Sequence, residues 1–202
     1  MSRPFLEQID QNIPKTDLKD HDKAVFILHD QLNLEAWPEW VQEEKPLLIF
    51  MESNEKGNDL PHHKVKATYI LSCMRHFALE CHEKGFPVLY HSTPEHFDDG
   101  LSELLQGYNG ELTYMTPSEW DTRERLQSLH EEMEDILNEI PNGFFIADAE
   151  EWKEKIEPGY RMEYFYRDMR RKTGYLMNDD DPEGGEWNYD DQNREKLPKD
   201  IE

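Results

Sequence analysis

The sequence predicts an α/β fold, namely a Rossmann-like open, mainly parallel five-stranded sheet with helices on both faces. The first observation is a series of short runs of consecutive apolar residues, a pattern typical of strands that are buried on both faces. The second is that segments with helical spacing of their apolar residues separate these runs. This alternation indicates parallel strands joined by helices, with right-handed crossovers.

Five segments are predicted to be strands because each is short, apolar and bounded by polar or turn-forming residues. The first reads K-A-V-F-I-L-H and the second reads P-L-L-I-F-M, and neither shows the alternation of a half-exposed strand. The five predicted strands are residues 23–29, 46–51, 86–91, 111–115 and 144–147.

The longest predicted helix runs from about residue 60 to residue 84, with Asp59 as its N-cap, Pro61 in its first turn and Gly85 at its end. Its apolar stripe has a clear helical period and comprises Ile70, Leu71, Met74, Phe77, Ala78 and Cys81. Two further helices are expected over residues 94–107 and 118–139. The second is expected to start at a Thr116 or Ser118 cap and to bury Leu126, Leu129, Met133, Ile136 and Leu137.

The stretch from residue 160 to residue 198 is the least generic part of the chain. Its apolar residues Met162, Phe165, Tyr166 and Met169 fall on one helical face, and Gly174 supplies a helix end. Arg167, Arg170, Arg171 and Lys172 crowd the rest of this helix. We expect them to pair with carboxylates of this acidic chain, although a phosphate or DNA contact is the alternative. An acidic segment with Trp187 and Asn188 follows.

The chain of 202 residues carries a formal net charge of −23. Such a charge argues against direct binding of nucleic acid or of an anionic membrane, because both need a clustered basic surface. It favours solubility, with an acidic partner-docking face as the alternative. The sequence contains no apolar run of membrane-spanning length and no signal-peptide core, and it is therefore expected to be cytoplasmic.

Two cysteines, Cys73 and Cys81, stand on the same predicted helix, roughly 12 Å apart along its axis, which is too far for a disulfide. We expect buried thiols in a reducing compartment. His62 and His63 are adjacent and point in different directions on a helix, so no metal site is predicted. The sequence lacks glycine-rich phosphate loops and a G-x-S-x-G nucleophile motif, and no catalytic residue is predicted.

Polar residues at the ends of the first two strands are the candidate binding residues. Ligands of open α/β sheets lie beyond the carboxyl ends of the strands. Asp30, Gln31 and Glu52 stand there and could hydrogen-bond the polar edge of a planar heterocycle, with Met51 and Ile70 as apolar faces. Asp30 could instead cap the next helix. Arg75 is expected to pair with a carboxylate.

Two segments of the sequence are distinctive when taken together. The first combines Asp30-Gln31-Leu32 with the H-H-K-x-K-x-x-x-I-x-S-x-M-R-H-F-A stretch at 62–78. The second is the long M-E-Y-F-Y-R to N-R motif at 162–194. Both resemble the N-terminal domain of the bacterial photolyase-related proteins, the iron–sulfur branch of the photolyase/cryptochrome family, of the prokaryotic (6-4) photolyase type.

The resemblance implies a photolyase antenna-type domain that holds 6,7-dimethyl-8-ribityllumazine. By motif, its contacts would be Asp30, Gln31, Leu32, Met51, Glu52 and Ile70. In the family, FAD, a [4Fe-4S] cluster and the lesion pocket belong to a helical C-terminal catalytic domain, through which damaged DNA would be bound. This chain is expected to lack that domain.

The expected organisation is an N-terminal arm over 1–22, the antenna-type domain over 23–160, and a helix plus extended acidic segment over 161–202 that leads to the absent catalytic domain. Arg167, Arg170, Arg171, Trp187 and Asn188 would be interdomain or structural residues. A blue-light sensory, cryptochrome-like module and a stand-alone nucleotide- or flavin-binding α/β protein remain as alternatives.

Overall fold

The structure, a computed structural model, describes residues 4–55, 62–147 and 149–190. The chain divides into two compact units, residues 1–146 and 147–202, and each is described by itself. The sequence-based prediction starts its last part at residue 161, whereas the second compact unit of the structure starts at residue 147. The predicted acidic tail beyond residue 190 lies outside the described residues.

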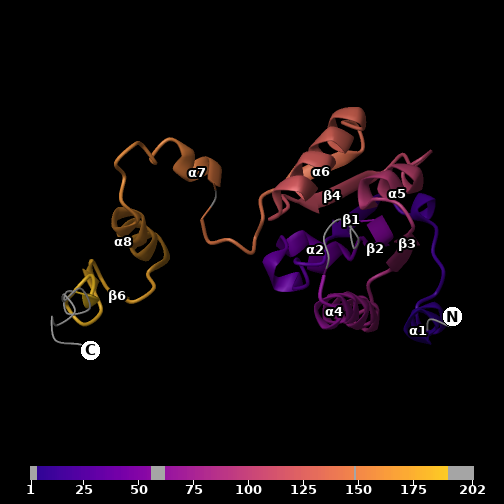
Figure 1. Cartoon of the computed structure of the whole chain (residues 1–202), viewed down its shortest axis with the longest axis horizontal. Coiled ribbons are helices and arrows are strands. Elements are labelled where there is room, and N and C mark those ends of the chain that lie inside the picture. The colour runs from indigo at the N-terminus through magenta and orange to yellow at the C-terminus, as the bar shows by residue number, and fades with distance from the viewer. Residues whose placement is uncertain (1–3, 56–61, 148, 191–202) are drawn as a thin grey trace, which may run out of the picture. The chain divides into compact units, whose positions relative to one another are not determined.

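The first unit is built on a five-stranded sheet with the order β3-β2-β1-β4-β5 (Figure 1). All four strand pairings are parallel, which confirms the predicted α/β fold. The strands are β1 (Lys23–Ile27), β2 (Leu47–Ser53), β3 (Val88–Thr93), β4 (Glu111–Met115) and β5 (Leu137–Ile140).

Apolar side chains on both faces of the central strands explain why these strands lack polar alternation. Ala24 and Phe26 of β1 belong to a core with helices α5 (Phe97–Leu104) and α6 (Trp120–Glu132). Val25 and Ile27 belong to a second core with α2 (Glu39–Glu44) and α4 (Lys64–Glu83). The sheet is therefore covered on both faces, as parallel sheets require.

The fifth strand lies at β5 and not at the predicted residues 144–147, and that prediction is wrong. Thr116 N–H donates to the Ile140 carbonyl at 2.9 Å, which continues the pairing of β4 with β5. Phe145 is instead 59% exposed, in a turn where the Asn142 side chain accepts from the Phe144 N–H at 3.0 Å. The predicted helix over 118–139 correspondingly ends at Glu132.

Helix boundaries differ from the predictions where a cap decides them. Asp59 and Pro61 lie outside the described residues, and α4 is capped by His63, whose Nδ1 accepts from the Val65 N–H at 3.2 Å. Neither Thr116 nor Ser118 caps α6, because Glu119 takes the N-cap position.

Gly100 lets α5 approach the sheet closely. A Cβ at this position would stand 2.9 Å from Thr93 Cγ2 and 3.1 Å from Met51 Sδ. Because real Cβ atoms essentially never stand as near as 2.9 Å to another heavy atom, a larger residue here would have to displace the Thr93 or Met51 side chain. The close approach seats α5 beside the carboxyl end of β2.

The N-terminal segment predicted as an arm contains helix α1 (Pro4–Asn12) and a 3-10 turn, η1 (Leu18–Asp20). Ile9 and Ile13 are buried in the same core as Ala78 and Cys81, so this segment packs on the domain. A second 3-10 turn, η2 (Leu34–Ala36), precedes α2. Cys81 is buried as predicted, and burial raises the pKa of its thiol to about 12, whereas Cys73 is only half-buried.

The second unit contains helices α7 (Ala149–Lys153) and α8 (Met162–Thr173) and a short antiparallel hairpin, β6 (Met177–Asn178) with β7 (Asp181–Pro182). Trp152 of α7 is buried and packs edge-to-face on Phe165 of α8, with ring centroids 4.7 Å apart. Gly174 ends α8 in the left-handed conformation, at φ 72°, as its sequence predicts.

Within the described parts of the two units, no helix combines the length and the apolar character that crossing a bilayer requires.

Candidate functional site

A cavity of about 500 Å³ opens beyond the carboxyl ends of β1 and β2. This is the edge of the sheet where open α/β folds place their ligands, next to the point where the strand order reverses between β1 and β4. Its walls come from these strand ends, from the first half of α4 and from the N-terminal turns of α5 and α6. The volume falls within the usual range for small-molecule sites.

The cavity combines apolar walls with a few polar groups. Its apolar lining comprises Phe26, Ile27, Leu28, Met51, Ala67, Ile70, Leu71, Met74 and Phe97. Its polar lining comprises His29, Glu52, Ser53, Asn54, His62, Lys66, Glu119 and Thr122. Such a combination suits a flat, largely apolar molecule with a small number of hydrogen-bonding groups.

Glu52 is the buried charge of this cavity, at 8% exposure. Arg75 of α4 approaches it with both arms of its guanidinium: Nε donates to Oε1 at 2.6 Å and Nη2 donates to Oε2 at 2.7 Å. The hydroxyl of Tyr90, on β3, also donates to Oε1. The hydrogen bond to Glu52 raises the pKa of Arg75, and burial together with Glu52 raises that of Tyr90.

The six residues predicted to contact a chromophore divide between four places. Met51, Glu52 and Ile70 line the cavity together. Asp30 is exposed and is not among the lining residues. Gln31 is fully buried in the turn after β1, where its amide interacts with the Leu28 N–H and the Met115 carbonyl, each at 3.4 Å.

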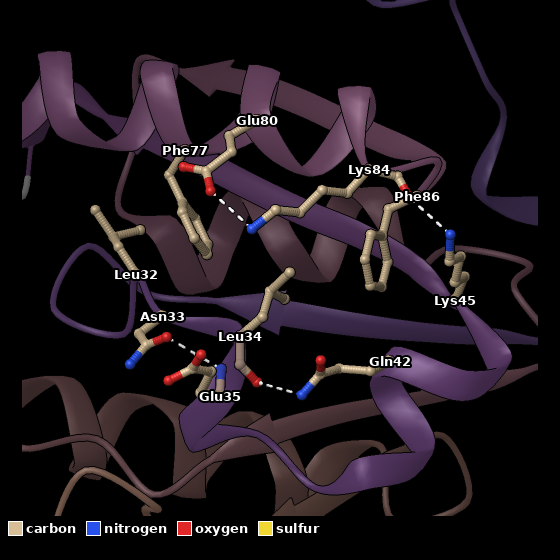
Figure 2. A pocket seen from close by; sticks show the side chains of 10 residues that line it. All are labelled: Leu32, Asn33, Leu34, Glu35, Gln42, Lys45, Phe77, Glu80, Lys84 and Phe86. Atoms are coloured by element: carbon tan, nitrogen blue, oxygen red, sulfur yellow. Dashed lines mark hydrogen bonds and ion pairs between the residues drawn. The ribbon is translucent and has the colours of Figure 1, made fainter.

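Leu32 lines a different hollow of about 530 Å³, between the β1–α2 connection and the second half of α4 (Figure 2). Polar groups there mostly contact one another: the Lys45 ammonium group donates to the Lys84 carbonyl, and Lys84 pairs with Glu80, at 2.6 and 2.7 Å respectively. With these groups satisfied internally, the hollow offers less to a ligand than the cavity at Glu52 does.

Sequence reasoning anticipated the ion pair of Arg75 but missed Tyr90. The two residues stand 23 and 38 positions from Glu52, so no local pattern connects them. His62, for which the sequence predicts no binding role, also lines the cavity. Among the residues that the structure describes, no group of three or more His, Cys, Asp and Glu side chains is arranged to hold a metal ion.

In the second unit, three guanidinium groups from α8 lie against the indole ring of Trp187. The distances from the guanidinium carbon to a ring centroid of Trp187 are 4.8 Å for Arg171, 5.3 Å for Arg167 and 5.5 Å for Arg170. Arg167 pairs with Glu163 and Arg171 with Asp168, which confirms the expected pairing with carboxylates for these two. Asn188 accepts from the Asp190 N–H at 3.3 Å.

Fold and cavity together define a Rossmann-like α/β domain with a cavity of about 500 Å³ at the carboxyl edge of its sheet. Residues 25–202 match the family model of the deoxyribodipyrimidine photo-lyase-related proteins, and the chain belongs to that family.

A curated relative supports the same assignment. The chain is 30% identical over 188 residues to a (6-4) photolyase of Agrobacterium fabrum (strain C58). The aligned region covers 89% of this chain and 37% of the relative, so the chain spans little more than a third of that protein's length.

Proposed function

We propose that the first unit holds a light-harvesting chromophore for a photolyase-related protein that repairs (6-4) photoproducts with light. The proposed chromophore is 6,7-dimethyl-8-ribityllumazine. The observation that carries the proposal is the cavity itself, in which Met51, Glu52 and Ile70, three of the residues assigned by the family resemblance, meet in one place.

The lining suits the chemistry of this chromophore. Met51, Ile70 and Leu71 offer apolar surface to a flat bicyclic ring. The carboxylate of Glu52 offers an acceptor to a ring N–H, and a hydrogen bond to a charged acceptor is about twice as strong as a neutral one. His62 and Lys66 supply polar groups for the hydroxyls of the ribityl chain.

Titration with the lumazine, followed by its fluorescence, tests the proposal. We expect saturable binding of one chromophore per chain, weakened about tenfold in Glu52→Gln because the charged acceptor is lost. Ala67→Trp is expected to abolish binding, since it places an indole in the wall of the cavity. Asp30→Ala should bind as the unaltered protein does, because Asp30 lies outside the lining. Absence of saturable binding would remove the proposal.

We further propose that the second unit docks the remaining part of the family's longer proteins. That part would carry the FAD, the [4Fe-4S] cluster and the lesion-binding residues. Met162, Leu176 and Tyr189 are 77%, 61% and 65% exposed and border one hollow of about 800 Å³, whose lining also includes Glu163, Glu183 and Asp190. Exposed apolar groups rimmed by polar ones are typical of an interaction site.

Hydrogen exchange on this chain alone and on the same chain fused to the C-terminal part of a longer family member tests the docking surface. We expect slower exchange of the backbone amides of residues 162–166 and 176–178 in the longer protein, because a docked domain shields them from water. Amides of α5 serve as the internal control and should exchange equally in both. Equal exchange at α8 and the hairpin would contradict the proposal.

A further inference from the structure

Glu52 is the group in the cavity whose orientation is most tightly determined. Its two oxygens accept three hydrogen bonds from two elements, the guanidinium of Arg75 on α4 and the hydroxyl of Tyr90 on β3. The side chains of Arg75 and Glu52 are only 18% and 8% exposed, so water competes little for these bonds. A carboxylate held in this way cannot turn to meet a ligand.

The three bonds are unevenly divided between the two oxygens. Oε1 accepts from Arg75 Nε and from the Tyr90 hydroxyl, whereas Oε2 accepts from Arg75 Nη2 alone among the described residues. A carboxylate oxygen has two lone-pair directions. Oε1 is therefore saturated, and Oε2 keeps one direction for a further donor.

We infer that Arg75 and Tyr90 are positioning residues that present Glu52 Oε2 as a single, directed acceptor for a ligand N–H or O–H group. The inference rests on the proposed function, because it concerns how that same cavity orients its chromophore. Neither Arg75 nor Tyr90 is among the lining residues, so each acts through Glu52 and not by contact with the ligand.

The bidentate geometry explains why arginine stands at position 75. A guanidinium matches both oxygens of one carboxylate in one plane, whereas the ammonium group of a lysine is a point charge that leaves the carboxylate free to rotate. The positive charge of Arg75 also balances the negative charge of the Glu52 carboxylate, so the pair brings little net charge to the cavity. A neutral donor is thereby favoured over a cationic ligand.

A double-mutant cycle on the full chain tests whether Arg75 acts through Glu52. The probe is 6,7-dimethyl-8-ribityllumazine, with its dissociation constant and the absorption maximum of the bound chromophore as readouts. We expect Arg75→Gln to weaken binding about tenfold and to move the absorption maximum toward that of the free chromophore. Tyr90→Phe, which removes one donor and no charge, should weaken binding about threefold.

The decisive variant is Glu52→Gln combined with Arg75→Gln. If Arg75 acts through Glu52, the double variant binds within about twofold of Glu52→Gln alone, whereas independent effects would multiply. Arg125→Gln is the matched control, because Arg125 pairs with Asp98 at 3.2 Å in the same unit and does not line the cavity. It should leave affinity and spectrum unchanged.

Outcomes separate the inference from the proposed function. Multiplying effects, or unaltered affinity in Arg75→Gln and Tyr90→Phe while the unaltered protein binds, would overturn the positioning role alone. Failure of the unaltered protein to bind would overturn both. If far-UV circular dichroism shows that Arg75→Gln does not fold, Tyr90→Phe replaces it in the cycle. The positioning role then requires that Tyr90→Phe combined with Glu52→Gln binds within about twofold of Glu52→Gln alone.

Discussion

Phe50→Ala is expected to lower the free energy of unfolding by about 3–5 kcal/mol, the usual cost of removing a large aromatic side chain from a core. Phe50 lies in the middle of β2, is fully buried, and packs against Phe77 and Tyr90 with ring centroids 6.0 and 6.1 Å away. Urea denaturation followed by far-UV circular dichroism measures the loss as a lower midpoint.

Phe145→Ala is the matched control for this prediction. The ring of Phe145 is 59% exposed, and we expect its removal to change stability by no more than about 0.5 kcal/mol. The sequence alone would predict the opposite, since residues 144–147 read as a buried strand. Similar losses in both variants would contradict the strand assignment of the structure.

Strands β1, β2 and β4 were predictable because a strand buried on both faces has a strong sequence pattern. Leu47 to Phe50 are all fully buried, and four consecutive apolar residues in a short run indicate this directly. The fifth strand carries a weaker pattern, because β5 is an edge strand whose Asn138 and Glu139 face polar surroundings. The apolar run at 144–146 resembled a core strand more closely than the real one did.

The C-terminal end of helix α6 is also ambiguous in the sequence, because the helical pattern continues into the residues that form β5. Met133, Ile136 and Leu137 continue the helical spacing that starts at Leu126 and Leu129, so periodicity extends the helix too far. In the structure Leu137 pairs with Leu112 of β4, and tertiary pairing overrides the local pattern. A short apolar run cannot be assigned to helix or strand by spacing alone.

The candidate site was predictable in position and only partly in composition. Strand ends located the edge of the sheet, and Met51 and Glu52 follow from that rule directly. Asp30 and Gln31 stand at an equivalent strand end but turn elsewhere, because the chain after β1 folds back so that Gln31 N–H donates to the Leu28 carbonyl at 3.0 Å. The direction of a side chain in such a turn depends on contacts distant in sequence, here the carbonyl of Met115.

The arginines of α8 have different roles that a count of charges does not distinguish. Arg167 and Arg171 pair with carboxylates on their own helix, and the pair of Arg171, which is exposed, contributes little to stability. Arg170 is 7% exposed and has no carboxylate partner among the described residues; its guanidinium donates to the carbonyls of Tyr175 and Leu176 and to the Tyr166 hydroxyl. Arg170 therefore links Tyr175 and Leu176, which follow Gly174, to helix α8 through hydrogen bonds.

Arg170→Ala is expected to destabilise the pairing of α8 with the hairpin by about 2–4 kcal/mol, because two carbonyls lose a charged donor and Trp187 loses a stacked guanidinium. Leu176 has a positive φ of 55°, a backbone conformation that needs outside contacts to persist. Hydrogen exchange measures the effect: the Glu183 N–H, which donates to the Leu176 carbonyl at 2.8 Å, should exchange much faster in the variant.

Arg171→Ala is the control one position along the same helix. Its side chain is 53% exposed, and its loss removes one surface ion pair and one contact with Trp187, for an expected change of about 1 kcal/mol or less. Arg170→Lys should behave like Arg170→Ala, because an ammonium group cannot reach both carbonyls and stack on the indole at once. Equal protection of the Glu183 amide in Arg170→Ala and Arg171→Ala would show that the hairpin is held by other contacts, and that the buried guanidinium does not organise this unit.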